Sequence, residues 1–341
     1  VSIFFVALLP GLPPRLMTRR LFGVVIGFSL VTTAVSLLQL AYWEGLLPFG
    51  LPAWLVTFQE GANQARGREL FALFIGDTGT HVWSAMLVLQ AIAVWVLASS
   101  SRRLGWRLLG MGYFGVLALL VVRTSVRNSI LGLVVVIGVL VLLQARRSRY
   151  AANRVARPLL LLLVGVLLLL GVFAFAADSY FVERIWQTIP RLEDGQLVVE
   201  RGSNVYGRVD YAVTALRMFA RSPIWGGGFY TYEIWTYRLR AAPIAHAHNS
   251  YLQALAEMGL IGFGALAWLL WRVWLLLRRA GRRVGAGDVW YGRLWRLTAA
   301  TALFLGFTAL FANPFWQPKE VAFCALLLAL LVRYEQAEAA A

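Results

Sequence analysis

The sequence predicts an all-α membrane protein, a polytopic bundle of transmembrane helices with one large loop outside the membrane. The chain of 341 residues is 60% hydrophobic and only 14% charged, which is too few charges to cover a soluble domain of this length. Its apolar residues form long blocks, such as the uncharged block at 159–177. Only helices and closed barrels cross a bilayer with their backbone groups satisfied. The blocks lack the strict alternation of barrel strands, which leaves helices.

Dividing the apolar blocks of the sequence at charged residues predicts a series of membrane spans, the first of which is partial. The span at 21–42 carries a polar stripe, so we expect it to pack against other helices. Because the chain starts at Val1 inside an apolar stretch, we also expect further spans upstream. The polar stripe consists of Thr32, Thr33, Ser36 and Gln39. The expected spans are 1–10, 21–42, 81–99, 108–122, 128–144, 158–177, 251–275, 297–312 and 319–333.

Arginines in alternate short loops predict the orientation, because positive residues stay on the cytoplasmic side. The basic loops therefore face the cytoplasm, and the segments 43–80 and 178–250 face outward. The net charge of +16 does not indicate nucleic-acid binding, because the basic residues lie between apolar blocks and form no soluble face. The chain divides into N-terminal transmembrane helices (1–177), an outer loop domain (178–250), and C-terminal transmembrane helices with a short cytoplasmic tail (251–341).

The outer loop at 178–250 is too long for a plain connector and is rich in aromatic residues. One interpretation is a belt of aromatic side chains at the membrane interface. The other is a platform for sugars, whose apolar ring faces stack on aromatic rings. The two are compatible, and we take Tyr206 and Trp225 as candidate substrate contacts.

Residues 209–222 predict an amphipathic helix with Ser203 or Asn204 as its cap. Arg208 projects away from the polar stripe of this helix. It therefore needs an anion, unless it snorkels or pairs with an acidic side chain. The polar stripe comprises Asp210, Thr214, Arg217 and Arg221, and the stripe away from it comprises Val209, Val213, Leu216 and Ala220.

The segment from Ser222 to Gly228 follows this helix. Pro223 stops the helix, and three consecutive glycines permit an unusual backbone path. Either a ligand approaches the backbone closely here, or the segment is a flexible turn. We favour the flexible turn.

Two of the three histidines, His246 and His248, lie where the loop meets the next span. A metal pair has no evident third ligand in the sequence, which leaves a structural pair or a general base. An imidazole pKa of about 6.5 suits removal of a proton from a sugar hydroxyl near neutral pH. Asn249 would help to orient the base. Glu257 either supports His248 or caps its own helix.

Arg123 and Arg127 flank a short outer turn between two spans. They are four residues apart and would share a helix face. Arginine near a membrane interior is costly and by default suggests a function, whereas the alternative is snorkelling to the outer interface.

The sequence also resembles a known family. One pattern in the chain resembles the signature of bacterial O-antigen ligases. It consists of His248-Asn249, nine further residues, Gly259, two further residues and Gly262. Thr124-Ser125 with Arg127 resembles their shorter Ser-Arg motif, although Val126 intervenes. The resemblance covers roughly 60–333 and is strongest over 205–262. An outer-loop segment similar to the family's comprises Gly207-Arg208, Ala215, Met218, Ser222-Pro223 and Gly226–Gly228.

This resemblance implies a GT-C-like glycosyltransferase of the bacterial inner membrane. It implies an inverting transfer, without metal or other cofactor, of a glycan from undecaprenyl pyrophosphate to a sugar hydroxyl of lipid A–core oligosaccharide in the periplasm. His248 would take the acceptor proton, and Arg208 and Arg127 would neutralise the pyrophosphate. The expected partners are these two substrates and membrane lipids. The expected substrate-binding residues are Arg123, Asn249, His246, Arg217, Tyr206 and Trp225.

Three alternatives to the ligase are considered, and the first two share much of this pattern. An O-antigen or exopolysaccharide polymerase would use a second lipid-linked glycan as acceptor, and a protein O-oligosaccharyltransferase would use a protein. A polysaccharide transporter or flippase predicts internal repeats and charges deep within spans. The sequence shows no repeat and places most charges between spans, so the transporter is the least favoured alternative.

Overall fold

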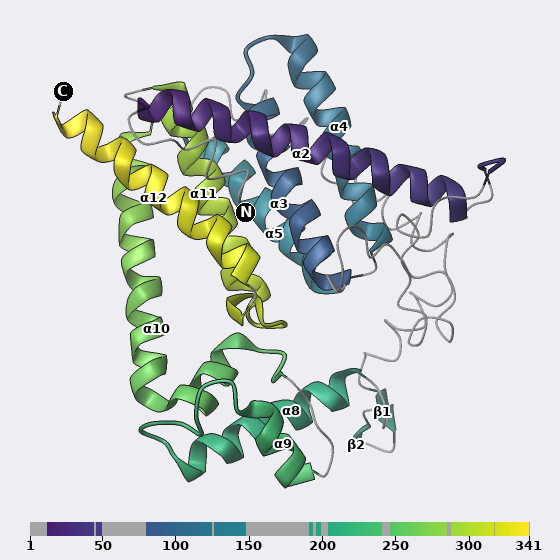
Figure 1. Cartoon of the computed structure of the whole chain (residues 1–341), viewed down its shortest axis with the longest axis vertical. Helices are drawn as coiled ribbons and strands as arrows, with labels where there is room; N and C mark the ends of the chain where they lie inside the picture. The colour runs from purple at the N-terminus through teal and green to yellow at the C-terminus, as the bar shows by residue number, and fades with distance from the viewer. Residues whose placement is uncertain are drawn as a thin grey trace. The chain divides into compact units, whose positions relative to one another are not determined.

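A computed structural model describes residues 12–43, 46–49, 80–124, 126–147, 191–193, 196–198, 204–240, 246–284, 288–316 and 318–340. Helices dominate these residues, as Figure 1 shows. The expected spans at 1–10 and 158–177 lie outside the described residues. The elements are α2 (Pro14–Trp43), α3 (Thr80–Ser99), α4 (Leu104–Arg123), α5 (Arg127–Arg147), β1 (Arg191–Glu193), β2 (Gln196–Val198), α8 (Asn204–Arg221), α9 (Tyr232–Arg240), α10 (Ser250–Arg283), α11 (Val289–Thr308), the 3₁₀ turn η4 (Pro314–Trp316) and α12 (Pro318–Ala340).

The helical prediction is confirmed, with one addition. Strands β1 and β2 pair antiparallel as a short hairpin, which the all-α prediction did not include. Within the described part of the chain, three helices are long and apolar enough to cross a membrane, namely Pro14–Gln39, Leu104–Arg123 and Ser250–Arg283. Shorter apolar helices lie at Trp83–Ser99 and Arg127–Leu143. Helices α11 and α12 cover the two remaining expected spans but lie outside this set.

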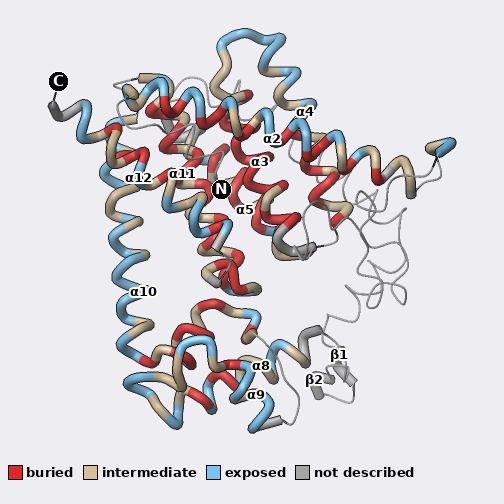
Figure 2. The backbone as a smooth tube through the Cα atoms, viewed as in Figure 1, coloured by how far each residue is buried: buried red, intermediate tan, exposed pale blue. Residues whose placement is uncertain are grey.

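The chain forms two compact units. We call 1–167, 279–304 and 322–341 the helix unit, and 168–278 with 305–321 the loop unit. In the helix unit, α3 is apolar on all sides and is buried almost throughout, which Figure 2 shows as a red tube. A helix that is hydrophobic all round belongs in the interior of a bundle. Trp95 of α3 packs edge-on against Phe114 of α4, with ring centroids 5.0 Å apart.

The polar stripe of α2 packs against α3 and α4, as the sequence predicted. The hydroxyl groups of Ser29 and Thr33 lie 2.7 and 3.0 Å from the Tyr113 hydroxyl on α4. Thr32 donates to Oε1 of Gln90 on α3 at 3.0 Å. Hydrogen bonds of this kind hold helices together where apolar contact alone gives little advantage over lipid.

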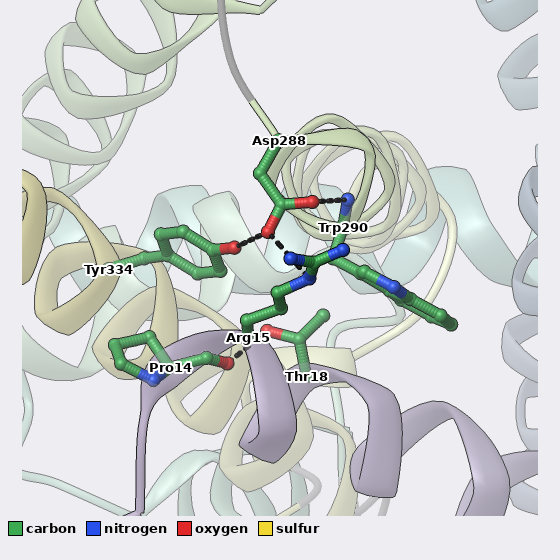
Figure 3. A network of polar contacts seen from close by, with 6 residues as sticks. All are labelled: Pro14, Arg15, Thr18, Asp288, Trp290 and Tyr334. Atoms are coloured by element: carbon green, nitrogen blue, oxygen red, sulfur yellow. Dashed lines mark hydrogen bonds and ion pairs between the residues drawn. The ribbon is translucent and has the colours of Figure 1, made fainter.

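A second polar network joins α2, α11 and α12 (Figure 3). Asp288 caps α11, because its Oδ1 accepts a hydrogen bond from the Trp290 amide at 3.0 Å. Its Oδ2 accepts from the Tyr334 hydroxyl of α12 and lies 3.3 Å from Nε of Arg15. The Arg15 side chain is 70% exposed and that of Asp288 only 20%. The cap and the tyrosine bond therefore contribute more than the ion pair.

Replacing Asp288 with alanine should lower the free energy of unfolding by about 1–3 kcal/mol, because the α11 amide and the Tyr334 hydroxyl lose their acceptor. Arg15→Ala, the control, should cost less than about 1 kcal/mol. Thermal unfolding in detergent, followed by tryptophan fluorescence, measures both. Equal losses in the two variants would show that the ion pair dominates the network.

Candidate active site

The loop unit is organised around a break in α10 at Gly259, whose φ is 62° and ψ is −163°. In an unbroken helix, the amides of Leu260 and Ile261 would bond to the carbonyls of Ala256 and Glu257. Instead, Leu260 donates to the Pro223 carbonyl at 2.8 Å and Ile261 to the Ile224 carbonyl at 3.3 Å. The turn after α8 has taken the place of one turn of helix.

The two carbonyls freed by this break also find partners in the same turn. Ala256 accepts from the Gly227 amide at 2.9 Å, and Glu257 accepts from the Gly228 amide at 2.9 Å. Buried backbone groups that lose their helical partner must be paired elsewhere. The exchange satisfies four of them at once and fixes the turn against α10.

This close approach explains the glycines of the turn and the helix. A Cβ at Gly226 would lie 2.3 Å from the Glu257 carbonyl oxygen, and one at Gly259 would lie 2.3 Å from the Ile224 carbonyl oxygen. Both glycines also have positive φ, which disfavours side chains. The prediction that 222–228 is a flexible turn is therefore wrong, because its glycines permit a fixed, hydrogen-bonded packing.

The buried carboxylate of Glu257 holds the start of α9. It accepts hydrogen bonds from the amides of Tyr230 and Tyr232, both at 3.1 Å. Tyr230 has a φ of 61°, a backbone conformation rare for a residue with a side chain. The sequence left open whether Glu257 supports His248 or caps its own helix. Its bonds run instead to the residues that begin another helix.

Gln253 connects Glu257 to the segment that carries the histidines. Its Nε2 donates to Glu257 at 3.2 Å, and its Oε1 accepts from the Ala247 amide at 3.2 Å and from Asn313 Nδ2 at 2.6 Å. Gln253, Glu257 and Asn313 are all buried. Buried hydrogen bonds of this kind allow few alternative arrangements of the groups that they join.

His248 lies at the end of a continuous series of contacts. The buried Tyr232, held by Glu257, donates its hydroxyl proton to the Tyr211 carbonyl of α8 at 2.7 Å. The Tyr211 ring stacks on the His248 ring, with centroids 5.4 Å apart and an interplanar angle of 29°. His248 itself is exposed and has a φ of 52°. Strained backbone at an exposed imidazole is typical of a functional position.

Arg208 lies one helical turn before Tyr211 on α8. Residues three apart on a helix are neighbours, with Cβ atoms about 5–6 Å apart. Arg208 is exposed, yet nearby protein desolvates part of its guanidinium and lowers its pKa from the ordinary value. Arginine stays charged under physiological conditions despite such a shift. Tyr211 thus lies next to both His248 and Arg208. Its spacing of three residues from Arg208 is the sequence signal that could have identified Tyr211 as part of the site.

Asn249 has a clear structural role. Its Oδ1 caps α10 by accepting from the amides of Tyr251 and Leu252, both at 3.0 Å, and its Nδ2 donates to the Leu310 carbonyl at 3.1 Å. His246 is half-buried, and its Nδ1 has no hydrogen-bond partner among the described residues. Asn249 thus fixes the backbone after His248, as the bond from the Ala247 amide to Gln253 fixes it before His248.

The remaining candidates differ in their surroundings. Trp225 and Arg217 are exposed in the loop unit, and the side chain of Tyr206 lies outside the described residues. Arg123 ends α4 and Arg127 begins α5, so the prediction that they share one helix face is wrong. Both arginines are half-buried and belong to the helix unit. The turn between them is fixed by Thr124, whose hydroxyl donates to Ser84 at 2.8 Å.

Comparison with known proteins supports the family that the motifs indicate. The O-antigen ligase family model matches residues 112–269. This segment of the chain is similar to the O-antigen ligase family. The match confirms the resemblance carried by the motifs, and it includes Arg127, Arg208 and His248. It also includes Gly259 and Gly262 of the signature. No curated protein matches the chain.

Gly226→Ala and Gly259→Ala should each prevent the loop unit from folding, because the new Cβ would collide with backbone. Gly264→Ala on the same helix is the control, since nothing lies within 4 Å of its added Cβ. Size-exclusion chromatography and thermal unfolding of the purified variants would compare them. Wild-type behaviour of Gly259→Ala would contradict the hydrogen-bond exchange described for this turn.

Proposed function

We propose that this protein is an O-antigen ligase of the bacterial inner membrane with a GT-C-like fold. In this proposal it transfers a glycan from undecaprenyl pyrophosphate to a sugar hydroxyl of lipid A–core oligosaccharide on the periplasmic side. The observation that carries the proposal is the exposed His248, stacked on Tyr211 beside Arg208, within the segment that matches the family. The family match itself supports glycosyl transfer from a lipid-linked donor.

The proposed reaction is a single displacement. Neutral His248 removes the proton of the acceptor hydroxyl while its oxygen attacks the anomeric carbon of the donor. The pyrophosphate departs on the side of the carbon opposite the attacking oxygen. The bond between that carbon and the phosphate oxygen breaks, and its electron pair leaves with the undecaprenyl pyrophosphate. The product linkage is therefore inverted. The exposure of His248 gives a bulky acceptor access to the imidazole.

The developing charge on the pyrophosphate needs fixed cations. We propose that Arg208 and Arg127 supply them, with Arg123 assisting, because planar guanidinium groups donate paired hydrogen bonds to phosphate oxygens. In this scheme no metal ion or other cofactor takes part. His246 and Tyr206 would contact the glycan chains, and Asn249 would act through its cap on α10.

The direct test is to combine the purified protein with lipid-linked glycan in the presence of EDTA and to offer either lipid A–core or a second lipid-linked glycan. Glycan attached to lipid A–core supports the ligase. Lengthened lipid-linked glycan would identify a polymerase, and dependence on added divalent ion would exclude the cofactor-free scheme.

His248→Ala and Arg208→Ala should each reduce this transfer by at least about 100-fold, since one removes the base and the other a cation at the leaving group. Arg238→Ala, which changes an exposed arginine on α9, serves as the control and should retain activity. Product formation is measured by gel or mass spectrometry. Full activity of His248→Ala would eliminate it as the base.

Tyr211 should position His248 through its ring. Tyr211→Phe keeps the stacking surface and should retain most activity, whereas Tyr211→Ala should lower kcat about 10-fold or more by freeing the imidazole. The rate profile against pH separates positioning from simple loss of folding, because the Phe variant should keep the wild-type profile. Equal activity in both variants would show that the stack does not matter.

A further inference from the structure

Helix α8 has two apolar faces, and among the described residues only one of them is covered. Ala215 and Met218 are buried in the core of the loop unit with Tyr232, Ala247 and Ala256. A second stripe on the same helix is exposed, with Val209 at 57% and Leu216 at 48%. At 3.6 residues per turn the two faces lie roughly 180° apart. The exposed stripe consists of Val209, Val213, Leu216 and Ala220.

This result reverses the simple amphipathic expectation, in which the apolar stripe of a helix faces the core. Thr214 of the polar stripe is buried instead, and its hydroxyl donates to the Asp210 carbonyl at 2.8 Å. The core of the loop unit therefore gives no reason for the apolar side chains on the far face. They remain available to apolar surroundings outside that core.

Arginines border the exposed stripe on both sides. Arg208 lies on one flank, and Arg217 and Arg221 lie on the other, all three exposed. Arg221 also lies over the Trp235 ring, 5.3 Å from its centroid. An apolar stripe with cationic borders is the arrangement of helices that lie in a membrane surface, with arginines among the lipid phosphates.

The turn after α8 connects this stripe to the apolar stretch of α10. Pro223 and Ile224 bond to Leu260 and Ile261, which open the apolar stretch of α10 after its break. Ile224 is 55% exposed, and Trp225, a residue type enriched at membrane interfaces, is 73% exposed. The exposed apolar surface thus runs from α8 through the turn to the apolar stretch of α10 that follows its break.

We propose that a lipid-facing stripe, formed by Val209, Val213, Leu216, Ala220, Ile224 and Trp225, docks into the surface of a bilayer that contains anionic phospholipid. The apolar side chains enter the acyl boundary, and Arg217 and Arg221 bind headgroup phosphates. A second copy of this chain would bring arginine borders together, so charge favours lipid over a homodimer. The inference goes beyond the glycosyl transfer proposed above and does not depend on it.

Spin labels test this docking in the full-length protein. The background variant is Cys324→Ser, since Cys324 is the single cysteine. A nitroxide on Leu216→Cys is compared with one on Glu233→Cys, an exposed acidic position at the start of α9. The protein is reconstituted into nanodiscs of phosphatidylethanolamine with phosphatidylglycerol. Collision rates are measured with oxygen, which concentrates in lipid, and with a water-soluble nickel chelate.

The label at Leu216 should collide more often with oxygen, and the label at Glu233 more often with the nickel chelate. Equal nickel access at the two positions would overturn the proposal, because the stripe would then face water. Spin–spin coupling at Leu216 that disappears on dilution with unlabelled protein would also overturn it, since a second copy would then cover the stripe.

The role of charge has its own comparison. In nanodiscs of phosphatidylcholine alone, the Leu216 label should become more accessible to the nickel chelate than in those with phosphatidylglycerol, because the arginines lose their anionic partners. The same accessibility in both membranes would contradict the part assigned to Arg217 and Arg221. The Glu233 label should be unchanged between them.

Discussion

The exchange of backbone hydrogen bonds at Gly259 is the constraint on which the loop unit depends. Four amides and carbonyls that would close one turn of α10 are paired with the turn after α8 instead. This pairing is possible only where both chains lack a Cβ, at Gly226 and Gly259. It fixes α8 against α10, so that the Tyr211 ring stacks on the His248 ring although the two residues are 37 positions apart in the sequence.

Buried side chains then carry this constraint to the candidate base. Glu257 holds the start of α9, Tyr232 joins α9 to Tyr211, and Gln253 holds the amide of Ala247. None of these residues needs to touch substrate for the proposed reaction. Their common effect is to keep His248 in a strained backbone conformation while its ring stays exposed. Rigid support of this kind is what a positioned general base requires.

Much of this arrangement followed from the sequence, for identifiable reasons. Apolar blocks predicted the helices, and the spacing from His248 to Gly262 predicted the family that residues 112–269 match. Local sequence patterns gave wrong predictions where contacts between distant residues determine the structure. They suggested a flexible turn at 222–228 and one helix for Arg123 and Arg127. Local patterns do not reveal that the Glu257 carboxylate and the Tyr230 amide meet across 27 positions.

The break in α10 also divides the kinds of sequence change that the helix can accept. Before Gly259, the helix carries buried residues that contact particular partners, namely Gln253, Ala256 and Glu257. Shape and hydrogen bonding therefore limit their replacement. After it, the apolar stretch has no buried residue and is limited mainly by hydropathy. Evolution can therefore exchange one apolar side chain for another along the second segment, while the first changes only together with residues on α9 and the turn.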